Sequence, residues 1–232
     1  MEKIWANSGD SHFLETADAW DALPADLKER MPRSVKDPSG EFETVFVDGR
    51  SFERKMPNPR QQAFIEASTQ SSGIGDVDVR LKDLDQEGIW AEVIYPSLGM
   101  WNGMLRDPAL VRSAMRVTND WVHDKLIKTS PRFVPTAQIS LIDIDDAVAE
   151  VERTAEMGFR AVFMTTKPPV QMKDYHYDEV WEPLWSACER ANVVVAFHIG
   201  TDPLDLAAGD EIGGLAHGEV GVRPPVSLRA TS

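Results

Sequence analysis

The sequence has a single cysteine, Cys188, and no apolar run long enough to cross a membrane. One cysteine excludes an intrachain disulfide and indicates a reducing compartment. No stretch approaches the roughly 18 apolar residues of a membrane helix. The N-terminus, MEKIWANSGDSHF, also lacks the continuous apolar segment of a signal peptide. We therefore expect a cytoplasmic protein with no membrane partner.

Positive charge is scarce as well. The chain has 24 lysines and arginines against 38 aspartates and glutamates, which gives a formal net charge of −14. Such a surface repels phosphate backbones, so we expect no nucleic-acid partner. A small-molecule substrate is the expected partner, and a homo-oligomer stays open. With 232 residues, 42% of them hydrophobic, the chain suits one globular domain.

Short β-rich runs recur along most of the chain. They predict five strands, at residues 4–10, 89–96, 132–140, 160–166 and 192–199. The last run is the clearest, because Asn-Val-Val-Val-Ala-Phe is almost continuously apolar until it meets His198. Continuous apolarity is typical of a strand that is buried on both faces of a parallel sheet.

Helical patterns fill the intervals between these runs. They cover residues 77–87, a helix that begins at Asp107 and stops at Ser130-Pro131, and residues 144–157 and 183–191. Asp107 is a suitable N-cap with Pro108 in the first turn, and Gly158 is a suitable left-handed C-cap. Strands and helices that alternate with short connections indicate βαβ units and a parallel α/β sheet.

Residues 13–76 interrupt this alternation with prolines, charges and no sustained period. We expect a long excursion after the first strand that covers one end of a barrel. A structureless loop of that length would be unusual, so short helices are expected near 16–31 and 59–70.

Five strands fall short of the eight that close a (β/α)8 barrel. The sequence after Asp205 has neither a strand-length apolar run nor a helical period. Either the sheet is open, or the chain is the front part of a TIM-barrel fold, with a partial barrel domain at 1–205 and an irregular tail at 206–232.

An aspartate and two histidines fall at the ends of predicted strands. Asp10 and His12 are two residues apart, so in a strand they point the same way and can reach one metal ion. His198 ends the clearest strand, where α/β barrels keep their sites. Carboxylate and imidazole suit zinc, manganese or iron. The alternatives are turn or cap roles for Asp10 and His12, and a hydrogen-bonded core role for His198.

Other candidate residues carry weaker signals. Lys167 follows the fourth strand, where it could meet an anionic substrate or simply lie at the surface. His123 falls off the apolar face of its helix, and His176 lies in a tyrosine-flanked loop. Glu15 and Trp20 follow the first strand directly, so we expect both beside the barrel mouth.

The run SGDSHFLETADAW resembles the opening of the amidohydrolase-related (amidohydrolase 2) family, in the branch of metal-dependent enzymes like aminocarboxymuconate-semialdehyde decarboxylase. Further matching segments follow in the family's order as far as about residue 205. They are Arg80-Leu81, Asp83-Leu84-Asp85, Glu87-Gly88, Glu92-Val93-Ile94-Tyr95-Pro96, Asn119-Asp120-Trp121, Gly158-Phe159-Arg160-Ala161-Val162, Pro183-Leu184-Trp185 and Phe197-His198-Ile199-Gly200-Thr201.

This resemblance implies a distorted TIM barrel with one divalent metal ion, for which we expect zinc, with manganese as the alternative. Asp10 and His12 match the two first-strand ligands of the family, and His198 matches its fifth-strand histidine. The family's sixth-strand histidine and eighth-strand aspartate have no assignable counterpart here, so no catalytic residue is predicted. Tyr95 and Lys167 are the expected substrate contacts.

The implied reaction is hydrolysis, or non-oxidative decarboxylation of a small organic or aromatic acid. Two alternatives stay open. The first is a catalytically incomplete barrel fragment, truncated or frame-shifted where the composition changes near Asp210, which as a monomer would be a poor catalyst. The second is an open doubly wound nucleotide-binding domain, disfavoured because no glycine-rich phosphate loop follows the first strand.

Overall fold

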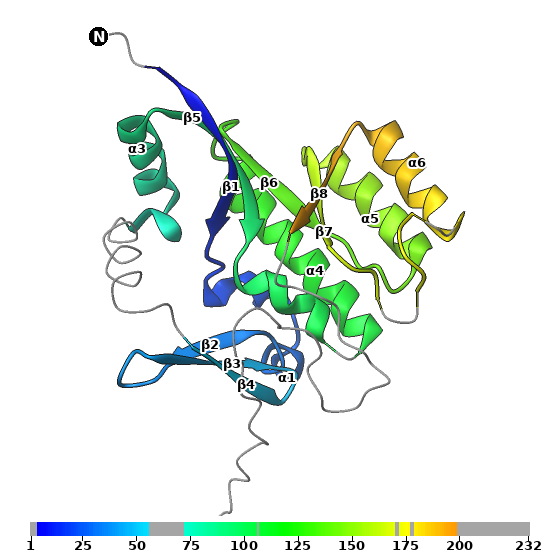
Figure 1. The fold of residues 1–232 in the computed structure, drawn as a ribbon, viewed down its shortest axis with the longest axis horizontal. Helices are drawn as coiled ribbons and strands as arrows, with labels where there is room; N and C mark the ends of the chain where they lie inside the picture. Colours follow the sequence, from blue (N-terminus) through cyan, green and yellow to red (C-terminus); the bar gives the residue numbers. More distant parts are fainter. Residues whose placement is uncertain (1–3, 56–71, 106, 170–171, 177–178, 199–232) are drawn as a thin grey trace, which may run out of the picture.

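The computed structural model describes residues 4–55, 72–105, 107–169, 172–176 and 179–198 (Figure 1). Its main sheet is parallel and has the strand order β1-β5-β6-β7-β8. The strands are β1 (Ala6–Phe13), β5 (Ile89–Pro96), β6 (Phe133–Gln138), β7 (Ala161–Thr165) and β8 (Val194–His198). All five predicted strands are therefore confirmed within a few residues, and so is the incomplete TIM-barrel type of fold.

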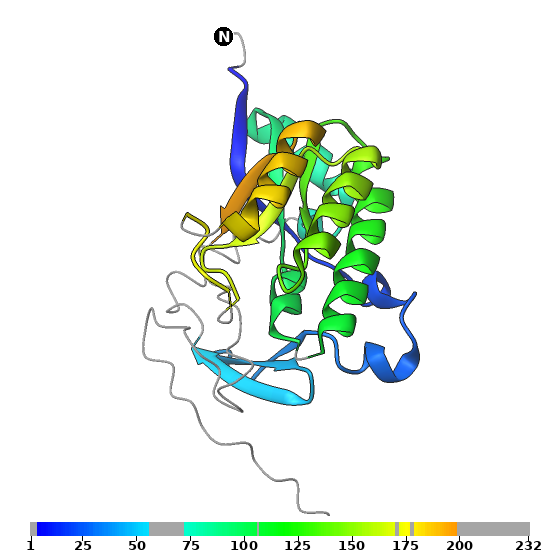
Figure 2. The ribbon, with the colours of Figure 1, turned by 90° about the vertical axis from the view of Figure 1, so that its right-hand side faces the viewer.

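Helices connect consecutive strands of this sheet. They are α3 (Val77–Glu87), α4 (Pro108–Val122) with the π-helical turn η4 (His123–Ile127), α5 (Ile144–Glu156) and α6 (Glu182–Ala191). Helices α4, α5 and α6 cover one face of the sheet (Figures 1 and 2). The expected caps are present: the Asp107 side chain accepts hydrogen bonds from the first turn of α4, and Gly158 has a φ of +104° after α5.

Packing between the helices and the sheet explains why these segments fold as they do. The largest fully buried side chain is Trp181, which lies in one cluster with Phe159, Met164 of β7 and Leu184 of α6. Cys188 belongs to the same cluster, as its place on an apolar helical face predicts. Among the residues described, no helix is long and apolar enough to span a bilayer.

The excursion between β1 and β5 was predicted only in part. Near residues 16–31 there are two short helices, η1 (Ala17–Trp20) and α1 (Ala25–Lys28), and the helix expected near 59–70 lies outside the described residues. The unpredicted feature is a second, antiparallel sheet of β2 (Arg33–Lys36), β3 (Phe42–Val47) and β4 (Arg50–Lys55).

The sequence signal for this second sheet was the pair Asp48-Gly49, a common two-residue hairpin turn. Both residues have a positive φ, +52° and +72°, as a two-residue hairpin turn requires. In β3, residues 43, 45 and 47 are buried and their neighbours are half-buried. The sequence shows no matching period, because Glu43 lies on the buried face while Phe42 and Phe46 lie on the other.

The small sheet lies beyond the carboxyl ends of the parallel strands (Figure 1). Its buried residues Val45, Val47 and Phe52 share a core cluster with Trp101 of η3 (Leu98–Met104) and with Trp20. The excursion therefore lies at one end of the parallel sheet, as predicted, and this is the end at which parallel α/β folds keep their sites.

Candidate metal centre

Strand β1 presents two of the three predicted ligands. One extra residue between Ser8 and Ser11 forms a bulge against β5, and Asp10 lies within it. Bulges re-aim side chains and are common beside functional sites. Two residues on, His12 pairs with Tyr95 of β5.

The third predicted ligand comes from the opposite edge of the sheet. His198 ends β8 and pairs with Thr165 of β7. In a flat sheet β1 and β8 would lie about 19 Å apart, four strand spacings of about 4.8 Å. Instead the His12 and His198 ring centroids are 5.0 Å apart. Only a sheet curled like a barrel wall brings the two edges so close.

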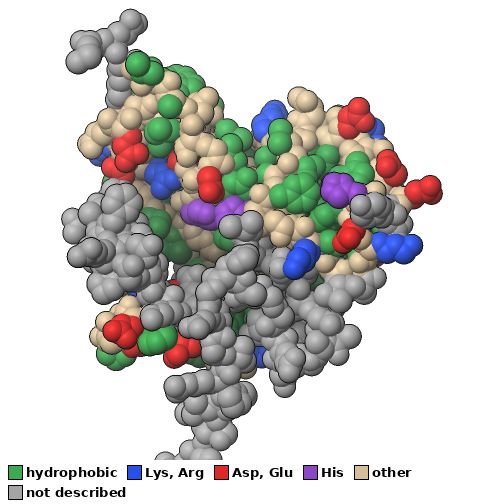
Figure 3. Space-filling view, viewed as in Figure 1, with side chains coloured by type: hydrophobic (Ala, Val, Ile, Leu, Met, Phe, Trp, Pro, Cys, Tyr) green, Lys and Arg blue, Asp and Glu red, His purple; other side chains and the backbone are tan. Residues whose placement is uncertain are grey.

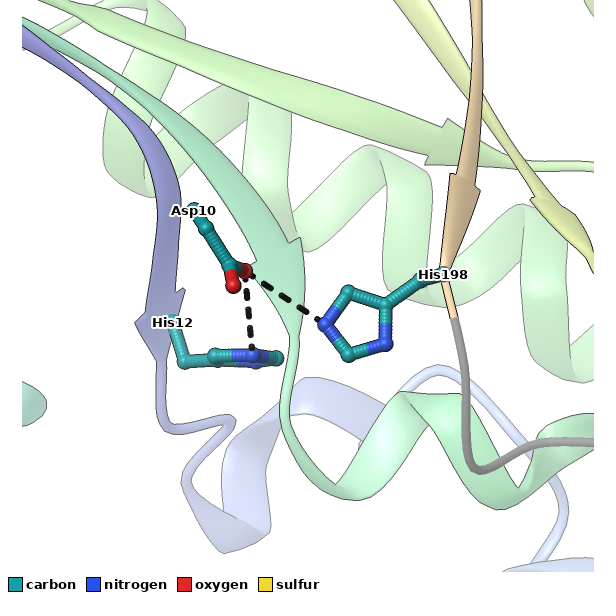
Figure 4. A group of neighbouring side chains, drawn as sticks. All are labelled: Asp10, His12 and His198. Carbon is teal, nitrogen blue, oxygen red and sulfur yellow. Dashed lines mark ion pairs between the residues drawn. The ribbon is translucent and has the colours of Figure 1, made fainter.

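Asp10, His12 and His198 converge on one point (Figure 4). The Asp10 Oδ1 atom lies 3.8 Å from His12 Nε2 and 3.5 Å from His198 Nε2. One ligand atom from each of the three residues lies within 4.8 Å of the others. The sequence proposed these residues as a set, and the structure brings all three together.

A hydrogen bond fixes the tautomer of His12. Its Nδ1 atom lies 2.9 Å from the carbonyl oxygen of Pro96. Because a carbonyl can only accept, Nδ1 carries the proton and donates it. The lone pair is therefore on Nε2, the nitrogen that faces Asp10. Metal-binding histidines in proteins are commonly oriented by such a bond from the other ring nitrogen.

The centre has an aromatic wall on one side. The ring of Tyr95 lies 4.7 Å from that of His198, and the ring of Phe163 lies 6.4 Å from it. On the other side it is open: the Asp10 side chain is 74% exposed, whereas that of His198 is 15% exposed. Histidine side chains reach the surface in the middle of this face, beside an acidic side chain (Figure 3).

The three residues fit a divalent ion. Bonds of about 2.0–2.2 Å to nitrogen and oxygen allow two ligand atoms of one ion to be up to about 4.4 Å apart. Both distances from Asp10 are below that limit, and the 4.8 Å bound on the set requires a contraction of at most a few tenths of an ångström. Two imidazoles and a carboxylate suit zinc and manganese.

The two predicted substrate contacts are placed differently. Tyr95 is buried beside His198, and burial together with the charge of Asp10 raises the pKa of its hydroxyl, which therefore stays protonated and able to donate. Lys167 is exposed in the loop after β7, where its carbonyl oxygen accepts from the Thr165 hydroxyl. Among the described residues, neither His123 nor His176 belongs to the group of possible metal ligands.

Glu15 and Trp20, expected beside the mouth, are both buried just beyond the end of β1. The carboxyl of Glu15 accepts hydrogen bonds from the backbone N–H groups of Ser97 and Leu98. Trp20 donates from Nε1 to the hydroxyl of Thr118, 3.2 Å away.

Sequence reasoning missed a group of buried polar residues: Asn102 on η3, Asn119 on α4 and Gln138 at the end of β6. Asn102 donates to Gln138 Oε1, and Asn119 exchanges two hydrogen bonds of 2.8 Å with the backbone of Gln138. All three side chains are at most 2% exposed. The available signal was Asn119 on an otherwise apolar helical face, and Gln138 near the end of an apolar strand.

Glu15 should make the stability of the protein depend on pH. Burial raises its pKa from the usual 4.5 to about 7, against the lowering effect of nearby backbone N–H groups. The folded protein thus holds a proton that the unfolded chain releases near pH 4.5. The proton bound by Glu15 therefore stabilises the folded state fully below pH 4.5. This stabilisation is lost as the pH rises to about 7, by at most about 1.4 kcal/mol of unfolding free energy per pH unit.

Urea unfolding of the wild type and of Glu15→Gln at pH 5, 6, 7 and 8 measures this effect. The free energy of unfolding of the wild type should fall relative to that of Glu15→Gln with each step up to pH 7, and the difference between them should then level off. Parallel pH profiles of the two proteins would show that Glu15 titrates normally.

Comparisons with known proteins agree with this architecture. Residues 94–221, more than half of the chain, match the model of a family described as amidohydrolase. A solved amidohydrolase from Mycobacterium avium subsp. paratuberculosis K-10 superposes with a TM-score of 0.67 at 20% identity, over 90% of this chain and 62% of that one. The chain thus spans less than two thirds of that relative's length. No curated protein sequence matches the chain.

Two further solved structures are decarboxylases with bound manganese. A 5-carboxyvanillate decarboxylase from Novosphingobium aromaticivorans has a TM-score of 0.56 at 18% identity, over 90% of this chain and 56% of that one. A dihydroxybenzoic acid decarboxylase from Polaromonas sp. JS666 has a TM-score of 0.51 at 16% identity, over 88% and 52%. At such identities the likeness shows a shared fold.

Proposed function

Because the chain belongs to the amidohydrolase family, we propose that it is a metal-dependent enzyme whose divalent ion is held by Asp10, His12 and His198. The observation that carries this proposal is the convergence of one carboxylate and two imidazoles from opposite edges of the parallel sheet. Their ligand atoms lie within 4.8 Å of one another at the strand ends.

We propose a small aromatic or other organic acid as the substrate, and non-oxidative decarboxylation or hydrolysis as the reaction. Two of the superposing structures are decarboxylases of hydroxylated benzoic acids, which favours decarboxylation. The rings of Tyr95 and Phe163 beside His198 offer an aromatic acid an edge or a face to pack against.

A bound divalent ion would supply positive charge that polarises the substrate. The residues of this chain would do the rest of the binding. The protonated Tyr95 hydroxyl is suited to donate to a substrate oxygen, and the Lys167 ammonium to attract a carboxylate to the strand ends. We expect zinc as the ion. Manganese is an equal candidate, because both superposing decarboxylases contain it.

Metal binding and turnover can be tested separately on the purified chain. After treatment with a chelator, titration calorimetry with Zn²⁺ and with Mn²⁺ should each show saturable binding of one ion per chain. The loaded protein is then assayed with hydroxylated benzoic acids for release of CO₂, and with esters and amides for hydrolysis.

We expect metal-dependent loss of the carboxylate from at least one benzoic acid. Hydrolysis without CO₂ release would assign the other reaction to the same site. Absence of saturable binding by either ion would contradict the proposed centre itself.

A further inference from the structure

His12 of β1 and Glu15, two residues beyond the end of β1, bind the peptide group between Pro96 and Ser97 from its two sides. The carbonyl oxygen of Pro96 accepts the hydrogen bond of His12 Nδ1 at 2.9 Å. The N–H of Ser97 belongs to the same peptide group, and it donates to both carboxyl oxygens of Glu15, at 3.2 and 3.1 Å. The next N–H, that of Leu98, donates to Glu15 Oε2 at 2.7 Å.

A peptide group is planar, and its C=O and N–H point in opposite directions. Fixing the N–H of Ser97 therefore also fixes the direction of the Pro96 carbonyl that orients the His12 ring. Hydrogen bonds in such a chain polarise one another, so the bond that the Ser97 N–H donates strengthens the bond that the Pro96 carbonyl accepts.

We propose that Glu15 is a positioning residue for the metal ligand His12, acting through the peptide group between Pro96 and Ser97. This inference rests on the proposed metal centre. Glu15 itself touches neither the ion nor the substrate in this role. It sets the tautomer and the ring orientation of His12.

The surroundings of Glu15 are built around its carboxyl group. The side chain is buried, and burying a carboxyl among apolar atoms costs free energy that hydrogen bonds must offset. Residue 99 is a glycine, where a Cβ atom would come within 2.7 Å of Glu15 Oε1 and would also collide with the side-chain amide of Gln138. Asn102 and Asn119 form hydrogen bonds with Gln138 in turn. The side chains that surround Gly99 beside Glu15 are therefore held in place.

The first test measures metal affinity in the full chain. Calorimetric titration with Mn²⁺ should show binding about 10–100-fold weaker in Glu15→Ala than in the wild type, the usual loss when an outer partner of a ligand is removed. Glu15→Gln keeps the shape and one accepting oxygen and should fall between the two. Glu43→Gln, at a buried glutamate of the small sheet, is the matched control and should bind as the wild type does.

The second test does not depend on metal. Nitrogen-15 NMR of the histidine rings in the metal-free protein reports which ring nitrogen carries the proton. The wild type should show His12 protonated at Nδ1, and Glu15→Ala should show a mixture of both tautomers. The signals of His123, which lies beside Asp124, should not change.

Wild-type affinity in a folded Glu15→Ala, or an unchanged His12 tautomer, would overturn the inference. If Glu15→Ala fails to fold, Glu15→Gln decides by the same two measurements. If the wild type binds no metal, the proposed function fails, and the tautomer measurement still decides whether Glu15 positions His12.

Discussion

His198→Ala should weaken the binding of Zn²⁺ or Mn²⁺ by at least about 100-fold. Outer partners of metal ligands are worth about 10–100-fold in affinity, and a ligand that touches the ion directly is worth more. With His198 removed, the group of possible ligands found among the described residues keeps two donors, Asp10 and His12, both from one strand. Calorimetry or a competitive metal indicator measures the change.

The matched control is His123→Ala. His123 lies on η4 beside Asp124, and its ring is 22% exposed. Removing it deletes an imidazole of the same kind outside the centre, so the affinity should stay within about twofold of the wild type. An equal loss in both variants would mean that the ions bind nonspecifically to surface histidines. Unchanged affinity in His198→Ala would rule out the proposed ligand set.

The parallel sheet could be predicted from the sequence because its strands carry their own signal. A strand buried on both faces reads as a continuous apolar run, as the buried residues 161–164 of β7 do, and caps such as Asp107 mark the helices between strands. Residues 192–197 carry the same signal, but the expected burial on both faces is wrong for them: β8 is an edge strand, with Val194 66% and Phe197 48% exposed. The hairpin of β3 and β4 was missed because its inner face rests on residues distant in the sequence, such as Trp101. Its sequence gives no hydrophobic alternation either, because Glu43 shares the buried face with Val45 and Val47.

The ligand set could be predicted because each ligand is marked locally. Asp10 and His12 have the spacing of one strand face, and His198 ends an apolar run. The hydrogen bonds that hold these ligands in place could not be predicted. Glu15 meets Ser97 across 82 positions of sequence, and the bond between His12 and Pro96 spans 84. Such pairings follow from strand register and from the curl of the sheet, which no local pattern encodes.

Arg80→Met should lower the free energy of unfolding by about 3–5 kcal/mol, the usual cost of removing one partner of a buried ion pair. Arg80 of α3 binds Glu92 of β5 through two parallel hydrogen bonds, of 2.8 and 2.7 Å. The Glu92 side chain is 1% exposed, so its carboxylate would stay buried without the counter-ion that Arg80 supplies. Methionine keeps much of the length of the arginine stem, which limits the loss of packing.

The double variant Arg80→Met with Glu92→Leu separates charge from packing. Replacing both members of a buried pair by apolar groups is often neutral or stabilising, so the double variant should regain most of the loss. Urea unfolding at pH 7 measures the free energy of unfolding of the wild type, of Arg80→Met and of the double variant. Lys128→Ala is the control: it removes an exposed ion pair with Asp124, so it should change the stability little. A double variant as unstable as Arg80→Met would show that α3 is held on β5 by side-chain packing and not by the need to neutralise Glu92.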